Sequence, residues 1–145
     1  MSAINLFTAE QQQRIIAVIR EAELATSGEI RVHIEKKCTE ENPVKRAIEV
    51  FGNLGMHQTA EQNGVLFYLA TEDRKFAIIG DKGINERVPA GFWDSTRELL
   101  RMHFAAGDYA EGLCRGIDEA GRQLKQFFPR AHDDSNELSD EISFK

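Results

Sequence analysis

Three short apolar segments predict β-strands. Residues Glu29–Glu35 alternate strictly between apolar and polar positions, the pattern of a strand with one covered face. Residues Val65–Ala70 are apolar throughout and follow the turn signal Asn63-Gly64, which predicts a central strand. The third segment, Lys75–Gly80, begins after a polar loop of four residues. A loop this short favours an antiparallel hairpin between the second and third strands.

Apolar positions spaced three and four residues apart predict helices between and after these strands. The predicted helices cover Glu10–Leu24, a segment beginning at Asn42-Pro43, Phe92–Phe104 and Tyr109–Phe127. The order of elements is therefore α-β-α-β-β-α-α. Because a helix separates the first two strands, they should be parallel and joined by a right-handed crossover. The pattern predicts an α/β fold with a small mixed sheet and helices on both faces.

Composition agrees with one domain and argues against several classes of partner. The chain has 145 residues, 41% of them hydrophobic, and single domains peak at roughly 100–150 residues. A net charge of -6 argues against nucleic-acid binding, which needs a basic face. The longest apolar run is far shorter than the roughly 18 residues of a membrane helix. The first seven residues carry no secretory signal, so we expect a cytoplasmic protein without a membrane span.

Strand directions bring several oxygen-bearing side chains to one edge of the predicted sheet. Glu29 begins the first strand, Asn63 precedes the second, and Asp81 follows the third, antiparallel strand. The loop after Asp81 continues at this edge towards Asp94. Carboxylate, amide and main-chain oxygens are the ligands of hard cations. We therefore predict a divalent metal site formed by Asp81, Asn63, Glu29 and Asp94, with calcium favoured over magnesium.

The same residues also fit purely structural roles. Asn63-Gly64 is a common turn pair, Asp81 opens another turn, and Glu29 can pair with Arg31. No nucleotide-binding loop, HExxH, GxSxG or CxxC motif is present, so catalytic residues are not identified. Lys82 and Arg87 are the cations that follow Asp81 closely in sequence.

The order of several short motifs resembles the TPM domain family. These motifs are Thr26-Ser27-Gly28-Glu29-Ile30, Asn63-Gly64-Val65-Leu66, Ile79-Gly80-Asp81-Lys82-Gly83-Ile84 and Gly107-Asp108-Tyr109. The resemblance implies a three-layer α/β/α sandwich, with calcium or other divalent ions bound in some members. It also implies the weak acid phosphatase activity claimed for plant members. The family's glycine-aromatic-glycine turn reads Gly80-Asp81-Lys82-Gly83 here, with an acid in place of the aromatic residue.

The resemblance extends over nearly all of the predicted elements. Residues 1–130 are interpreted as a single TPM-like domain, and residues 131–145 as an acidic, mobile C-terminal tail. Three functions stay open. The first is a divalent-cation-binding accessory module in protein assembly or quality control. The second is a weak metal-dependent acid phosphatase, and the third is a protein-interaction domain without metal. A protein partner and the oligomeric state are also left open.

Overall fold

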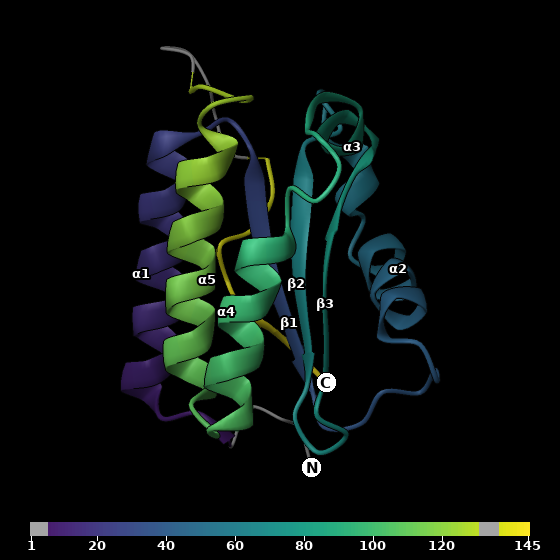
Figure 1. Ribbon diagram of the computed structural model, residues 1–145, viewed down its shortest axis with the longest axis vertical. Coiled ribbons are helices and arrows are strands. Elements are labelled where there is room, and N and C mark those ends of the chain that lie inside the picture. The colour runs from purple at the N-terminus through teal and green to yellow at the C-terminus, as the bar shows by residue number, and fades with distance from the viewer. Residues whose placement is uncertain (1–5, 131–136) are drawn as a thin grey trace.

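A mixed sheet lies at the centre of the protein, between helices on both faces (Figure 1). The computed structural model describes residues 6–130 and 137–145. The strands lie in the order β3-β2-β1-β4, and β2 is antiparallel to β3 whereas the other two pairs are parallel. Their bounds are Glu29–Glu35 for β1, Gly64–Ala70 for β2, Lys75–Gly80 for β3 and Ser143–Phe144 for β4. The predicted α/β/α sandwich is confirmed.

Helices α1, α4 and α5 cover one face of the sheet, and α2 covers the other (Figure 1). The bounds are Ala9–Ala25 for α1, Pro43–Asn53 for α2, Met56–Gln58 for the short 3₁₀ helix η2, Lys82–Arg87 for α3, Asp94–Ala105 for α4 and Tyr109–Leu124 for α5. The start of α1 is a capping box, in which Thr8 and Gln11 each bond the other's backbone N–H. At the start of α2, the Asn42 side chain accepts from the Val44 N–H.

Each face of the sheet has its own hydrophobic core. Along β2, Val65, Phe67 and Leu69 face the core beneath α1, α4 and α5, whereas Leu66 and Tyr68 face the core beneath α2. All of these side chains are buried. This two-sided burial explains why the sequence of β2 is apolar throughout.

Strand β1 is also buried on both faces, which differs from the single covered face that its alternation predicts. His33, on the face expected to be open, is 5% exposed. Its ring stacks on Tyr68, with 6.0 Å between the ring centroids. The face is covered because Arg46 of α2 reaches the carboxylate of Glu35 and closes over the end of the strand. Glu35 therefore bonds His33 and Arg46 instead of facing water.

The acidic C-terminal residues do not all form a mobile tail. Residues Ser143–Phe144 pair with β1 in parallel, and the Lys145 N–H donates to Ile34 O at 2.9 Å. The Phe144 ring lies 6.3 Å from that of Phe7. The tail prediction is thus wrong for this segment, because a few apolar side chains within it pack on the core and its backbone pairs with the edge of β1. Residues 131–136 lie outside the described residues.

Candidate metal site

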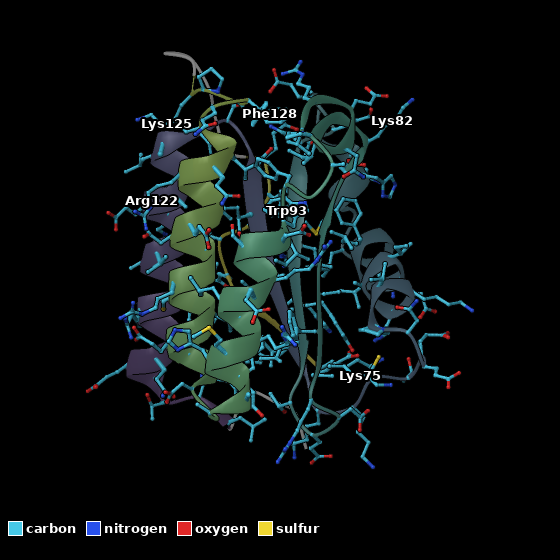
Figure 2. The ribbon with its side chains drawn as sticks, viewed as in Figure 1. Lys75, Lys82, Trp93, Arg122, Lys125 and Phe128 are labelled. Atoms are coloured by element: carbon cyan, nitrogen blue, oxygen red, sulfur yellow. The ribbon has the colours of Figure 1, made fainter. Side chains whose placement is uncertain are left out.

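The strand register brings three of the four predicted ligands to one edge of the sheet. Glu29 lies opposite Gly64 in the β1–β2 pair, and the Asp81 N–H donates to Gly64 O at 2.8 Å. The Glu29 N–H donates to Asn63 O at 3.0 Å. Glu29, Asn63 and Asp81 therefore begin or end neighbouring strands at the same end of the molecule. Figure 2 shows Lys82 at this end and Lys75 towards the opposite one.

Asn63 contributes a buried oxygen that has no hydrogen-bond donor. The residue is 4% exposed. Its side-chain nitrogen donates to Ser27 O at 2.6 Å and lies 3.5 Å from a carboxylate oxygen of Glu61. The amide oxygen, Oδ1, has no partner among the described residues. An unsatisfied buried acceptor costs about 1–3 kcal/mol, so this atom is suited to receive a water or a cation.

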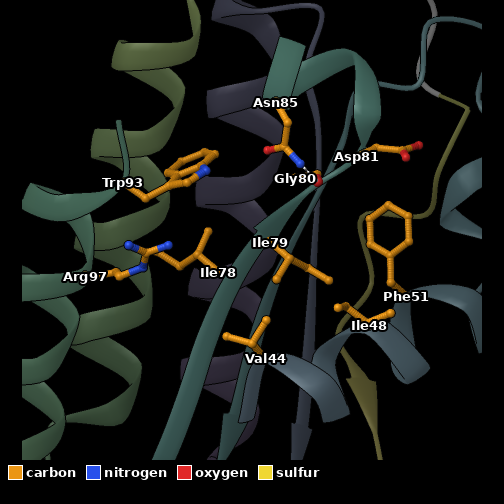
Figure 3. A pocket seen from close by; sticks show the side chains of 10 residues that line it. All are labelled: Val44, Ile48, Phe51, Ile78, Ile79, Gly80, Asp81, Asn85, Trp93 and Arg97. Carbon is orange, nitrogen blue, oxygen red and sulfur yellow. Dashed lines mark hydrogen bonds between the residues drawn. The ribbon is translucent and has the colours of Figure 1, made fainter. Parts of the chain in front are cut away.

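Asp81 has one satisfied and one unsatisfied carboxylate oxygen. It is the N-cap of α3, and its Oδ1 accepts from the Lys82 N–H at 2.8 Å. Its Oδ2 is buried and has no partner in the described part of the chain. Figure 3 shows the carboxylate directed away from Asn85 and Trp93. One half of the carboxylate thus fixes the helix start, and the other half remains available.

Main-chain oxygens of the preceding loop lie against the helix that Asp81 caps. A Cβ atom at Gly83 would lie 2.3 Å from Glu61 O and 2.6 Å from Gln62 O. Only glycine leaves room for such an approach. The carbonyls of residues 61 and 62 therefore pack against the first turn of α3, close in the chain to Asn63.

Glu29 uses its carboxylate to hold the C-terminal segment. Its Oε1 accepts the backbone N–H groups of Glu137 and of Leu138, the latter at 2.7 Å. Burial raises the pKa of Glu29, and the two N–H groups oppose that rise. Because these donors already satisfy one oxygen, the contacts of Glu29 do not by themselves require a metal.

Asp94 lies in the first turn of α4, and its side chain is 75% exposed. It forms an ion pair with Arg97, at 3.4 Å between Nη1 and Oδ1. Within residues 6–130 and 137–145, no hydrogen bond or ion pair joins Asp94 to Glu29, Asn63 or Asp81. The loop before α4 thus leads Asp94 to a solvent-exposed position.

The oxygens at this end of the sheet belong to amide, carboxylate and main-chain carbonyl groups. Across the described ranges, no group of three or more His, Cys, Asp or Glu side chains is arranged to hold a metal ion. A cation here would need the amide oxygen of Asn63, the carboxylate of Asp81 and main-chain carbonyls together, a set that hard cations accept. Glu61 is an additional acid beside Asn63 that the strand-direction argument missed. Glu61 could have been predicted from the sequence, because it lies two residues before Asn63 in the same turn.

A second polar cluster lies at the other end of β1 and is internally satisfied. Glu35 accepts two hydrogen bonds from Arg46, both at 2.9 Å, one from the Tyr68 hydroxyl at 2.5 Å and one from His33 Nε2 at 3.0 Å. Burial alone would raise the pKa of Glu35, but these donors outweigh it and lower the pKa to about 2. Because His33 Nδ1 also contacts Ser143 Oγ at 2.9 Å, the imidazole is committed to structure at both nitrogens.

Comparisons with known proteins agree with this architecture. The NMR structure of the BA42 protein from the psychrophilic bacterium Bizionia argentinensis sp. nov. is 48% identical, with a TM-score of 0.91 and 97% of each chain covered. The N-terminal domain of a P. gingivalis protein is 20% identical, with a TM-score of 0.71, covering 88% of this chain and 83% of that one.

The N-terminal domain of the cg2496 protein from Corynebacterium glutamicum is 13% identical, with a TM-score of 0.67, covering 94% of this chain and 84% of that one. At such identities these last two structures show the fold alone. No curated protein matches the chain. No helix in the described parts of the chain is long and apolar enough to cross a membrane. The family model of the TPM domain matches residues 2–123. The chain belongs to the TPM domain family.

Proposed function

We propose that this TPM domain binds a divalent cation beside Asn63 and Asp81, with calcium preferred over magnesium. The observation that supports the proposal is the pair of buried oxygens, Asn63 Oδ1 and Asp81 Oδ2, that lack hydrogen-bond donors. Asn63 directly precedes Gly64, and the Gly64 carbonyl accepts a hydrogen bond from the Asp81 N–H. The two oxygens therefore belong to residues at the same end of the β2–β3 pair. A buried carboxylate oxygen without a donor is costly, and a bound cation would remove that cost.

The kinds of oxygen at the site favour calcium. Calcium accepts six to eight oxygen ligands in flexible arrangements, including carboxylate, amide and main-chain oxygens. Magnesium demands near-ideal octahedral geometry and keeps several waters. Asn63, Asp81 and the carbonyls of Glu61 and Gln62 would supply ligands of the three types that calcium uses. In the cell, such a module would serve as an accessory domain in protein assembly or quality control.

A phosphatase function has weaker support. Phosphoryl transfer needs cationic groups positioned around the phosphoryl oxygens. Lys82 Nζ lies 3.8 Å from a carboxylate oxygen of Glu86, and the Arg87 guanidinium lies 4.9 Å from the centre of the Phe128 ring. These two cations, which follow Asp81 in sequence, already have other contacts.

The proposal is tested by thermal unfolding of the full chain with millimolar calcium chloride or with EDTA. Calcium that binds only the folded state raises the melting temperature by mass action. We expect Asp81→Asn, which keeps a good helix cap, to reduce this rise strongly. Asp108→Asn is the matched control, because Asp108 is the N-cap of α5 and makes no capping hydrogen bond. Equal melting temperatures in calcium and EDTA would refute the proposal.

A further inference from the structure

Strand β3 is the outer strand on one side of the sheet, and its outer edge is accessible between two helical walls. Among the described residues, no strand pairs with this edge. A groove of about 370 Å³ lies along the last part of this edge, from Ile78 to Asp81, and Phe76 precedes it in the strand. Figure 3 shows Val44 and Ile48 of α2 on one side of β3, and Trp93 and Arg97 on the other. The groove therefore has a β-strand at its base and a helix on each side.

The hydrogen-bonding pattern of the β2–β3 pair shows which backbone groups face this groove. The Asp81 N–H donates to Gly64 O, so the backbone groups of Asp81 point towards β2. Along an antiparallel strand, residues whose backbone groups bond the neighbouring strand alternate with residues whose backbone groups point away from it. The backbone groups of Gly80, Ile78 and Phe76 therefore point away from β2. The Asn85 side chain donates to Gly80 O at 3.0 Å, as expected for a carbonyl that faces outward.

The accessible part of this edge is short. Asn85 occupies the outward carbonyl at one end. At the other end, Lys75 Nζ donates to Glu41 O at 2.9 Å, which ties the start of β3 to the loop before α2. Between these two points, Phe76 and Ile78 retain their outward N–H and C=O groups. An added strand could therefore make up to four backbone hydrogen bonds with β3.

The two walls of the groove differ in chemistry. On the α2 side, Ile48 is 59% exposed and Val44 is 43% exposed, although both are aliphatic. On the α4 side, the Arg97 guanidinium has an exposed ion pair with Asp94 at 3.4 Å, and such pairs contribute little. Successive side chains of a strand point to opposite faces. A strand added to β3 would thus place alternate side chains on an aliphatic wall and on a cationic one.

We propose that this groove binds an extended segment of another protein by β-strand addition to β3. The segment alternates aliphatic residues, which contact Ile48 and Val44, with acidic residues, which contact Arg97. Main-chain hydrogen bonds to Phe76 and Ile78 supply the pairing, and the two walls supply the selectivity. Edge strands that avoid such pairing carry inward charges, prolines or bulges, and Phe76-Ala77-Ile78-Ile79 has none of these. Asp81 also lines the end of the groove, but the strand pairing at Phe76 and Ile78 does not require a cation at Asn63 and Asp81.

The test uses the ¹⁵N-labelled full chain and a synthetic peptide of alternating valine and glutamate, eight residues long by design. We expect saturable chemical-shift changes at the Phe76 and Ile78 amides, and at least tenfold slower hydrogen exchange there. Two variants address the walls. Ile48→Glu should weaken binding at least tenfold, and Arg97→Glu should shift preference to a valine–lysine peptide. Met102→Glu is the matched control, since Met102 is 65% exposed on α4 and does not line the groove.

A second peptide separates strand addition from simple hydrophobic contact. Methylation of its backbone nitrogens on the side that faces β3 removes hydrogen-bond donors and leaves the side chains unchanged. Loss of binding by this peptide supports the proposal. Equal binding of the methylated peptide, or shifts that leave the Phe76 and Ile78 amides unchanged, would overturn it. A dimer in analytical ultracentrifugation that Ile48→Glu dissociates would also overturn it, because a second copy would then occupy the edge.

Discussion

Glu35 shows how a charged residue is retained in the interior of this domain. Its carboxylate is buried, and both oxygens accept from the Arg46 guanidinium. Removing one partner of a buried ion pair leaves an uncompensated charge, which costs more than the pair contributes. The Tyr68 and His33 hydrogen bonds to the same carboxylate would not replace the missing positive charge.

We expect Arg46→Ala to lower the free energy of unfolding by about 3–5 kcal/mol, the usual cost of leaving one buried charge unpaired. Urea denaturation followed by circular dichroism measures this change. The control is Lys45→Ala, because the Lys45 side chain is 71% exposed and its ion pair with Glu40 spans 3.6 Å. If both variants unfold at the wild-type urea concentration, the Glu35–Arg46 pair contributes nothing measurable to stability.

Glu23 is expected to make stability depend on pH in the opposite sense to Glu35. Burial raises the pKa of Glu23 from 4.5 to about 9, and the neighbouring carboxyl group of Asp140 adds to the rise. A raised pKa means that the folded state holds its proton more tightly than the unfolded state. The contribution of Glu23 is therefore complete below pH 4.5 and is lost as the pH rises towards about 9.

The measurement is the free energy of unfolding of wild type and of Glu23→Gln between pH 5 and pH 9. Glutamine stays neutral and can still accept from the Ile30 N–H, which Glu23 bonds at 3.0 Å. We expect the variant to lose less stability than wild type as the pH rises. Glu21→Gln, at an exposed position of the same helix, should follow wild type. Parallel curves for wild type and Glu23→Gln would contradict the raised pKa.

At the scale of elements, β2 supports both hydrophobic cores. Leu66 is fully buried in the core beneath α2. We expect Leu66→Ala to destabilise the domain by about 2–5 kcal/mol, because the substitution removes buried methyl groups and leaves a cavity. Met102→Ala, at an exposed position of α4, should change the stability by less than about 0.5 kcal/mol. A denaturation midpoint for Leu66→Ala within error of wild type would show that β2 does not carry this core.

The elements that sequence patterns predicted correctly are those with local signals. Strands β1 to β3, the hairpin and helices α1, α2, α4 and α5 follow from apolar spacing, caps and turns within each segment. Strand β4 could not be predicted in this way, because its two residues lie in an acidic segment without a repeating pattern. Its pairing depends on the edge of β1, more than a hundred residues away in the chain.

The candidate site likewise has features that strand order predicts and features that depend on tertiary packing. Strand directions were sufficient to predict that Glu29, Asn63 and Asp81 share one edge, since parallel and antiparallel pairing fixes where each strand begins and ends. The contacts of Glu29 with residues 137 and 138 depend on tertiary packing, which no local pattern encodes. The position of Asp94 depends on the path of an irregular loop, and the prediction required that loop to fold back.

At the scale of the whole molecule, the two proposed sites adjoin at the end of β3, where Asp81 also lines the groove. The cation site involves the ends of strands, where buried oxygens of Asn63 and Asp81 lack donors. The groove involves the outer edge of β3, where backbone groups lack a partner strand among the described residues. Because Ile48 lines the groove and Asn63 does not, substitutions at these two residues can test the two sites separately.

The cation site is tested most directly by a calcium titration of the ¹⁵N-labelled chain followed by NMR. We predict saturable shifts of the Asn63 side-chain NH₂ and of the Gly64 and Lys82 amides, weaker effects with magnesium, and at least tenfold weaker calcium binding in Asp81→Asn. Shifts confined to exposed acids of the C-terminal segment, such as Glu137 and Glu141, would contradict the proposed site, as would a spectrum that calcium leaves unchanged.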